Sequence, residues 1–243
     1  MGKRKKRKRK IQWKKWFKMI LFLAILGLFT YVFVLSDLFY IREITYHDQE
    51  KVAKEELEDR MPVQKGDHIF LAKTKEAARD LEKIPYVKTI DTLRVFPDEL
   101  KVYVTERIPY IAYYDGENYA YVDEEKVVVE ITDVIPDESM PMVTGVMQKN
   151  PPVEGETFEV FPTWLTDTLF ASVATLKQAE LFAHISEIHI EENHVLSLYT
   201  NGGSILQVRD EENISQQIDF IFTFLKENDD RMIVDITHGV NPI

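Results

Sequence analysis

The chain has 243 residues, which is enough for a membrane segment and one or two small domains, and it contains no cysteine. The missing cysteines exclude disulfide bonds and thiolate metal sites. The net charge of -11 is divided unevenly, because the first 18 residues carry +11 and the remainder carries -22. A domain this acidic repels nucleic acid, so the basic block does not extend into a nucleic-acid-binding surface.

The first predicted element is a membrane-spanning helix. Met19 to Leu35 is a run of seventeen residues without a charge. The aromatic residues on either side lengthen this run toward the roughly 20 residues that a bilayer core requires. Eleven Lys and Arg residues and no acidic residue precede the run, which predicts a cytoplasmic N-terminus and an extracytoplasmic C-terminus. The flanking aromatic residues are Trp13, Trp16, Phe17, Phe39 and Tyr40.

Two other interpretations of this N-terminal region stay open. A lysine-rich decamer is also typical of nucleic-acid binding, and an apolar run near the N-terminus is also typical of a cleaved signal peptide. The run ends in FVLSDLFY, without the small-residue pattern of a cleavage site, and this favours a retained span. We expect the basic residues to set the topology, with anionic lipid head groups as their candidate ligand.

A small α+β domain is predicted directly after the span. The pattern of apolar and turn residues indicates the order strand, helix, helix, strand, strand. In the last of these strands Leu100, Val102 and Val104 share one face, whereas the apolar residues of the strand before it keep no single parity. The predicted ranges are Ile41–Tyr46, Ala53–Arg60, Thr74–Lys83, Val87–Val95 and Leu100–Glu106.

Beyond Tyr110 the sequence predicts a second domain that is rich in strands. Turn residues separate short alternating segments, and proline and glycine indicate a loop-rich passage from Pro136 to Gly155. The predicted helices are Trp164–Leu181 and Ile214–Lys226. The predicted strands are Tyr110–Tyr114, Tyr119–Val122, Lys126–Ile131, Ile185–Ile190, Val195–Thr200, Ser204–Arg209 and Met232–Thr237.

Three short motifs resemble the POTRA domain of the bacterial cell division proteins FtsQ and DivIB. They are LEKIPYV from Leu81, FPDELKVYV from Phe96 and ERIP from Glu106. The order of basic tail, single span, POTRA domain and β-rich domain is also similar to that family. The resemblance implies a membrane-anchored α+β fold: one N-terminal transmembrane helix, a POTRA domain of order β-α-α-β-β, and a mostly antiparallel β domain with flanking helices.

This resemblance also implies a division of the chain into five parts. They are a basic cytoplasmic tail at 1–18, a transmembrane helix at 19–38, the POTRA domain at 39–107, the β domain at 108–240 and a short C-terminal end at 241–243.

The sequence shows no catalytic, metal-binding or cofactor-binding constellation. His184, His189 and His194 recur every five residues, a spacing that neither a strand nor a helix brings to one face. Motifs of serine hydrolases, zinc proteases and phosphate-binding loops are missing. We therefore expect no enzyme, no metal and no cofactor, and we look for a surface that binds other proteins.

The last predicted strand is the first candidate for such a surface. At a sheet edge its unpaired backbone groups accept a strand from a partner, whereas in an interior or covered position they do not. The resemblance implies the same segment, since in FtsQ the terminal strand and the preceding helix receive the FtsB-type partner, called DivIC in Gram-positive relatives. Phe220 is included because it falls nearly opposite the apolar stripe of its helix, with burial against a loop as the alternative. The candidate residues are Phe220, Arg231, Met232, Ile233, Val234, Asp235, Ile236 and Thr237.

The first strand of the POTRA-like domain is the second candidate, because POTRA folds elsewhere bind extended segments by strand addition. A simple spacer is the alternative. The candidate residues are Ile41, Arg42, Glu43, Ile44, Thr45 and Tyr46.

The resemblance implies a non-enzymatic, single-pass scaffold of the divisome, located in the cell membrane at the division septum. Its expected partners are DivIC/FtsB-like and FtsL-like coiled-coil proteins, with septal peptidoglycan synthases as further candidates, and its expected role is to help organise septal cell-wall synthesis. A membrane-anchored cell-wall enzyme and a ligand sensor are the alternatives. The eighteen residues before the span leave no room for the output domain of a sensor.

Overall fold

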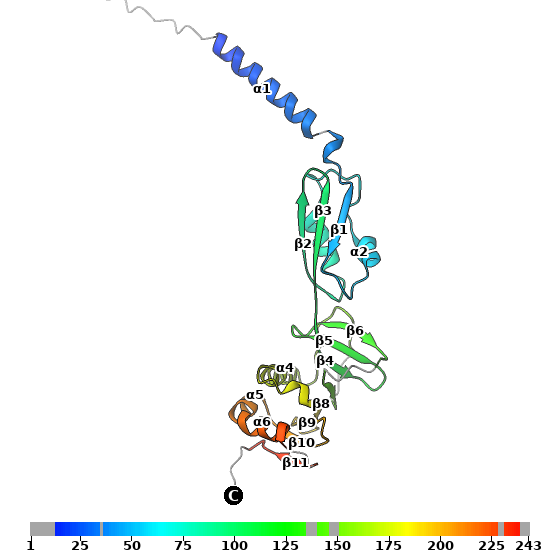
Figure 1. Ribbon diagram of the computed structural model, residues 1–243, viewed down its shortest axis with the longest axis vertical. Helices are drawn as coiled ribbons and strands as arrows, with labels where there is room; N and C mark the ends of the chain where they lie inside the picture. The colour runs from blue at the N-terminus through cyan, green and yellow to red at the C-terminus, as the bar shows by residue number, and fades with distance from the viewer. Residues whose placement is uncertain (1–12, 35, 135–139, 146–150, 228–230, 239–243) are drawn as a thin grey trace, which may run out of the picture.

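The computed structural model describes residues 13–34, 36–134, 140–145, 151–227 and 231–238. A long helix, α1 (Trp13–Val34), leads into a first domain, and a second domain follows on the side away from α1 (Figure 1). Residues 13–33 are long and apolar enough to cross a membrane, and none of this stretch is buried in the protein. It is the one such helix in the ranges given above.

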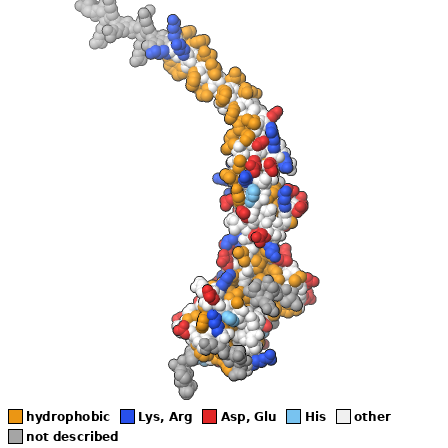
Figure 2. Space-filling model, in the orientation of Figure 1, with side chains coloured by type: hydrophobic (Ala, Val, Ile, Leu, Met, Phe, Trp, Pro, Cys, Tyr) orange, Lys and Arg blue, Asp and Glu red, His pale blue; other side chains and the backbone are white. Residues whose placement is uncertain are grey.

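The length of α1 suits a bilayer. Its 22 residues span about 33 Å at about 1.5 Å per residue, against a hydrocarbon core of about 30 Å. The helix begins at Trp13, before the uncharged run, so the flanking aromatic residues Trp16 and Phe17 are helical. Figure 2 shows hydrophobic side chains along α1 down to its junction with the first domain. A single turn of 3₁₀ helix, Asp37–Phe39, makes that junction.

The first domain is a three-stranded sheet with two short helices. The strand order is β1 (Glu43–His47), β3 (Glu99–Glu106), β2 (Val87–Val95), with β1 parallel and β2 antiparallel to β3. Helices α2 (Lys54–Arg60) and α3 (Thr74–Leu81) lie between β1 and β2 in the chain. The predicted order β-α-α-β-β is confirmed.

The core of the first domain lies between this sheet and its helices. Leu100, Val102 and Val104 of β3 are buried on one face, as the alternation predicts. In β2 both Val87 and Ile90 are buried although they differ in parity, because the pairing register shifts between Val87 and Thr89. An irregularity of this kind changes which residues face the core, and it explains the unclear pattern of this strand.

The second domain is built on an eight-stranded sheet. Its strand order is β11-β10-β9-β8-β7-β4-β5-β6. Four of the seven neighbouring pairs are antiparallel, and the pairs β11/β10, β8/β7 and β7/β4 are parallel. The strands are β4 (Pro109–Tyr114), β5 (Tyr119–Asp123), β6 (Val128–Thr132), β7 (Met142–Thr144), β8 (Ile185–Ile190), β9 (Leu196–Thr200), β10 (Ile205–Val208) and β11 (Ile233–Asp235).

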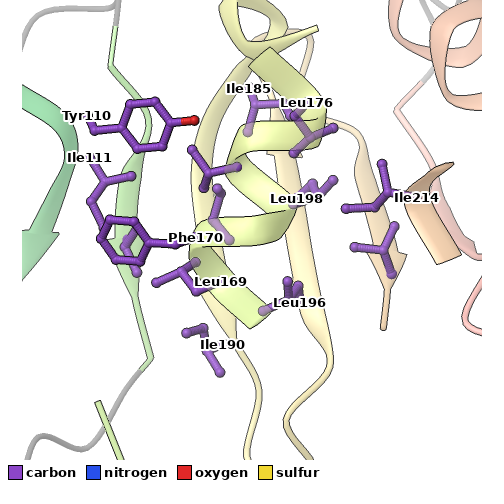
Figure 3. Packing of buried hydrophobic residues seen from close by; sticks show 14 of the residues in the cluster. Tyr110, Ile111, Leu169, Phe170, Leu176, Ile185, Ile190, Leu196, Leu198 and Ile214 are labelled. Atoms are coloured by element: carbon purple, nitrogen blue, oxygen red, sulfur yellow. The ribbon is translucent and has the colours of Figure 1, made fainter. Parts of the chain in front are cut away.

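Three helices accompany this sheet: α4 (Thr163–Gln178), α5 (Glu211–Gln216) and α6 (Ile218–Glu227). Figure 3 shows α4 lying over the sheet, with Leu169 and Phe170 toward Ile111 of β4 and Leu176 toward Ile185 of β8. These side chains belong to one buried cluster. The helix predicted over Ile214–Lys226 is divided at Gln217 into α5 and α6, and a 3₁₀ turn, Phe182–His184, precedes β8.

Ion pairs and hydrogen bonds join the two domains. Arg107 donates from Nη1 to Oδ2 of Asp123 at 2.6 Å and to Oε2 of Glu125 at 2.8 Å. The side chains of Arg107 and Asp123 are 15% and 2% exposed. Tyr86 of the first domain donates its hydroxyl hydrogen bond to Glu130 of β6. A buried charged contact therefore lies where the chain passes from one domain to the next.

Candidate partner-binding edge

Strand β11 lies at one end of the eight-stranded sheet. Its partner is β10, because Ile205 N donates to Met232 O at 2.9 Å and Ile236 N donates to Gln207 O at 3.0 Å. In a parallel pair the residues that bond the neighbouring strand alternate with residues whose N-H and C=O groups point away from it. The backbone groups of Ile233 and Asp235 therefore point to the outer side of the sheet.

The opposite end of the sheet is covered. Strand β6 is bonded along its outer side by a following loop, with Val128 N donating to Glu156 O at 2.9 Å and Gly155 N donating to Val128 O at 2.8 Å. The Ile131 amide donates to the Glu154 carboxylate at 2.9 Å. Over the ranges of the chain that the structure describes, no strand or loop covers β11 in this way. Between the two ends of this sheet, β11 is the one that the described residues leave open.

Helix α5 fixes the position of β11. The carbonyl oxygen of Ile236, just after the strand, accepts hydrogen bonds from Asn213 Nδ2 at 2.8 Å and Gln217 Nε2 at 2.9 Å. The side chain of Ile236 is buried in the core. Two buried amides on one carbonyl hold the strand in register even though only one of its sides is paired.

Asp235 closes the strand with a local turn. Its Oδ1 accepts from the hydroxyl of Thr237 at 2.7 Å and from the Thr237 backbone N-H at 2.9 Å. These two hydrogen bonds lower the pKa of Asp235, because they favour the charged carboxylate. The turn keeps Thr237 buried while the Asp235 side chain itself stays exposed.

The side chains of this segment divide into an inner and an outer set. Val234 packs against the core, and Ile236 and Thr237 are buried. Ile233 is 68% exposed and Met232 is 40% exposed. Of the seven candidate residues from Arg231 to Thr237, those exposed to a partner are Arg231, Met232, Ile233 and Asp235.

Phe220 does not lie where the helical stripe predicted. It is half-buried, packs against the core and stacks on Phe224 with ring centroids 6.0 Å apart. The predicted orientation was wrong because the buried face of α6 centres on Ile221 and Phe224, whereas Ile218 and Leu225 of the predicted stripe are only half-buried. The aromatic ring that α6 exposes is Phe222, with the Lys226 ammonium 4.1 Å from its centroid.

A cleft of about 520 Å³ lies beside the C-terminal end of β11. Asp235 and His238 line one part of it, and the exposed Trp164 of α4 lines another together with His194 and Arg209. Trp164 was not among the predicted site residues, because its position at the start of a predicted helix did not show that it lies near the last strand.

The second candidate surface is less accessible than predicted. Ile41 is buried and lies outside β1, with its backbone N-H and C=O bonded to Asp67 and Gly66 at 2.8 Å. Ile44, Thr45 and Tyr46 are half-buried, which leaves Arg42 and Glu43 exposed. Burial raises the pKa of Tyr46 to about 12, and the negative charge of Glu58 adds to this shift. Strand β1 is an edge strand, but it presents a small polar surface.

No group of three or more His, Asp or Glu residues with a geometry suited to a metal ion occurs in the ranges that the structure describes. The candidate site at β11 is a surface of backbone groups and exposed side chains.

Comparison with known proteins agrees with this architecture. A family model described as POTRA domain, FtsQ-type, matches residues 39–107. The cell division protein FtsQ of Anaeromyxobacter sp. (strain K) is 27% identical over 180 residues, covering 71% of this chain and 58% of the relative. The cell division protein DivIB of Clostridium acetobutylicum is 24% identical over 112 residues, covering 46% and 45%. The chain spans about half the length of the curated relatives that it matches.

A solved structure is also similar: the major extracytoplasmic domain of the trans isomer of DivIB from Geobacillus stearothermophilus. It is 17% identical with a TM-score of 0.34, and the match covers 51% of this chain and 98% of that domain.

These features define a class: proteins in which one apolar N-terminal helix precedes an FtsQ-type POTRA domain and a second domain that is mostly sheet. Within that class, the chain is similar to the bacterial cell division proteins FtsQ and DivIB, and its first domain matches the FtsQ-type POTRA domain.

Proposed function

We propose that this chain is a non-enzymatic, single-pass scaffold of the bacterial divisome. Its basic N-terminus lies in the cytoplasm and both folded domains lie outside, in the cell membrane at the division septum. It binds DivIC/FtsB-like and FtsL-like coiled-coil proteins and thereby helps to organise septal cell-wall synthesis, with septal peptidoglycan synthases as further candidate partners. The observation that carries this proposal is the edge strand β11, at the end of the second domain away from the FtsQ-type POTRA domain (Figure 1).

In this proposal the partner binds by adding a strand to the edge of the sheet. The outward N-H and C=O groups of Ile233 and Asp235 bond an extended segment of the partner, and the exposed side chains of Met232 and Ile233 add apolar contact. An edge that presents unpaired backbone groups without a covering loop is favourable for this kind of pairing. The edge of β1 is a second, smaller surface for the same chemistry.

Membrane anchoring makes modest affinity sufficient. When two proteins share one bilayer, each binding event occurs at a raised effective concentration. A strand of three residues, Ile233–Asp235, therefore holds a partner that is anchored beside it more tightly than the same strand holds a soluble peptide.

The orientation of the backbone indicates the best test. Replacement of Ile233 by proline removes an outward N-H and leaves the bonds to β10 in place, whereas Val234→Pro acts on an inward residue and disturbs the pairing with β10. We expect full-length Ile233→Pro to lose capture of the DivIC-like partner in co-purification. Ile233→Ala keeps the amide and serves as the matched control, with partial retention expected. Unchanged capture by a folded Ile233→Pro variant contradicts the proposed interface.

The topology is tested separately. Protease added to intact protoplasts is expected to digest the segment beyond Ser36, since both domains lie outside the membrane in this proposal. Protection of the whole segment contradicts the proposed orientation.

A further inference from the structure

The end of the POTRA domain that adjoins α1 carries a cluster of exposed apolar side chains. Leu38, Phe70 and Phe96 are about half exposed, and Leu71 is 76% exposed. They come from three separate segments: the junction after α1, the loop before α3 and the turn between β2 and β3. We call these four residues the apolar tip. Exposed large apolar side chains gathered in one place mark an interaction surface.

Ring contacts join the apolar tip to the membrane helix. Phe33 of α1 contacts Phe39 with centroids 4.7 Å apart, Phe39 contacts Phe70 at 5.2 Å, and Phe70 stacks on Phe96 at 4.9 Å. Only residues 35 and 36 separate α1 from the 3₁₀ turn that begins the domain. With so short a connection, the tip lies at the boundary of any bilayer that α1 crosses.

The fold holds the tip firmly. In the loop before α3, Ile69 is buried and Ile69 N donates to Phe39 O at 2.9 Å. Arg94 of β2 donates to the carbonyls of Ile69 and Ala72, each at 2.8 Å. A guanidinium that fixes both ends of this turn keeps Phe70 and Leu71, which lie between them, on the outside. The exposure of these two side chains is therefore a built feature of the domain.

Charge gives the tip no preference for anionic head groups. Arg42 is 3.5 Å from Asp98, and Lys73 is 2.9 Å from Glu76, so these nearby cations are paired within the domain. Asp37, beside Leu38, is exposed and acidic. Aromatic and aliphatic side chains at the end of a span are typical of the interface between head groups and acyl chains.

We propose that the apolar tip inserts into the outer head-group and acyl boundary of the same bilayer that α1 crosses, and that this contact fixes the orientation of the POTRA domain on the membrane. The occupant is the lipid surface. The inference rests on the membrane crossing of the proposed function, and it adds a second membrane contact made by the folded domain.

The absence of cysteine in the sequence permits single-site labelling of the full-length chain. The Leu71→Cys variant is labelled with a polarity-sensitive fluorophore and placed in nanodiscs of zwitterionic lipid, with one copy of the chain per disc. The lipids carry bromine at shallow acyl positions, where it quenches a fluorophore that enters the bilayer surface. Ile108→Cys is the matched control, because Ile108 is 77% exposed and lies beyond the other end of β3. Leu23→Cys with deep bromine reports the crossing of α1.

The expected result is loss of fluorescence at Leu71→Cys and at Leu23→Cys, with none at Ile108→Cys. If Leu23→Cys is quenched but Leu71→Cys is quenched no more than Ile108→Cys, this inference is overturned and the proposed anchoring remains intact. Quenching at Leu71→Cys that requires anionic lipid or two copies per disc also overturns it. If Leu23→Cys is not quenched, the proposed anchoring fails and this inference fails with it.

A second variant tests whether the tip acts as one surface. In chains labelled at Phe96→Cys, the additional change Leu71→Asp is expected to abolish quenching of the label, because a carboxylate disfavours insertion of the whole tip. The additional change Ile108→Asp is expected to leave quenching unchanged. Quenching at Phe96→Cys that survives Leu71→Asp contradicts insertion of the tip as a unit.

Discussion

Replacing Arg107 with alanine leaves the Asp123 carboxylate buried without its cationic partner. Oδ1 of Asp123 keeps the hydrogen bonds from the backbone N-H groups of Glu125 and Val127, at 3.0 and 2.8 Å, so Oδ2 alone loses its donor. Breaking a buried ion pair costs about 3–5 kcal/mol, and an unsatisfied buried acceptor costs about 1–3 kcal/mol. Because half of the carboxylate stays bonded and Arg107 is partly exposed, we expect a loss of about 2 kcal/mol.

The pKa shifts of the groups around Asp123 agree with a stabilising ion pair. Burial alone would lower the pKa of the Arg107 guanidinium, but its hydrogen bonds to Asp123 and Glu125 outweigh burial and raise it. The hydrogen bonds from Arg107 and Lys88 also lower the pKa of Glu125. The contribution of Glu125 is therefore present above its usual pKa and is lost as the pH falls through the lowered value.

Trp164 allows the loss to be measured in the second domain. The remaining tryptophans, Trp13 and Trp16, lie at the start of α1, so in a background with phenylalanine at both positions the fluorescence of Trp164 reports this domain alone. Urea unfolding of the full-length chain in detergent then gives the free energy of unfolding. Lys88→Ala, which removes a half-buried cation paired with the exposed carboxylates of Glu124 and Glu125, is the matched control with a much smaller expected loss. Equal stabilities of the Arg107→Ala and Lys88→Ala variants would refute the reasoning.

Three further changes test the structure. Glu106 accepts the backbone N-H groups of residues 50–52, so Glu106→Ala is expected to speed hydrogen exchange at those amides and to destabilise the first domain by about 1–3 kcal/mol. Since the pKa of Tyr46 is raised to about 12, its neutral form stabilises the fold below pH 10 and this contribution is lost as the pH rises to about 12. Tyr46→Phe is therefore expected to flatten the alkaline loss of stability in urea titrations, and an unchanged slope contradicts this. Burial raises the pKa of Asp210, but the hydrogen bond from the Asn213 amide contributes to a net lowering, so Asp210→Ala is expected to cost about 1 kcal/mol at neutral pH and progressively less in acid.

The first domain was predicted well because its elements are short, local and separated by clear turn residues. Alternation along β3 identified Leu100, Val102 and Val104 as a buried face, and the structure confirms it. The buried face of the neighbouring strand β2 was not predictable from alternation, because an irregular register changes the parity between Val87 and Ile90. Such irregularities depend on the partner strand, which the sequence of one strand does not describe.

The second domain was harder to predict, because its sheet depends on contacts between distant segments. Strand β7 has three residues, Met142–Thr144, within the passage that the sequence marked as loop-rich, and it is parallel to both of its neighbours. Three residues are too few to show a period. The last strand was a candidate because of its apolar run and the family resemblance. The orientation of Phe220 was missed because the predicted stripe left out Phe224, which is buried beside it.

The brevity of β7 has a mechanical consequence for the second domain. It pairs with β4 at two positions and with β8 at three, so few backbone bonds join the POTRA-proximal hairpin to the half of the sheet that ends in β11. Helix α4 packs over both halves, with Phe170 beside Tyr110 of β4 and Leu176 beside Ile185 of β8 (Figure 3). A force applied to β11 would therefore reach β4 through these few backbone bonds and through the side chains packed under α4. Substitutions under this helix alter the stiffness of the link without changing either end of it.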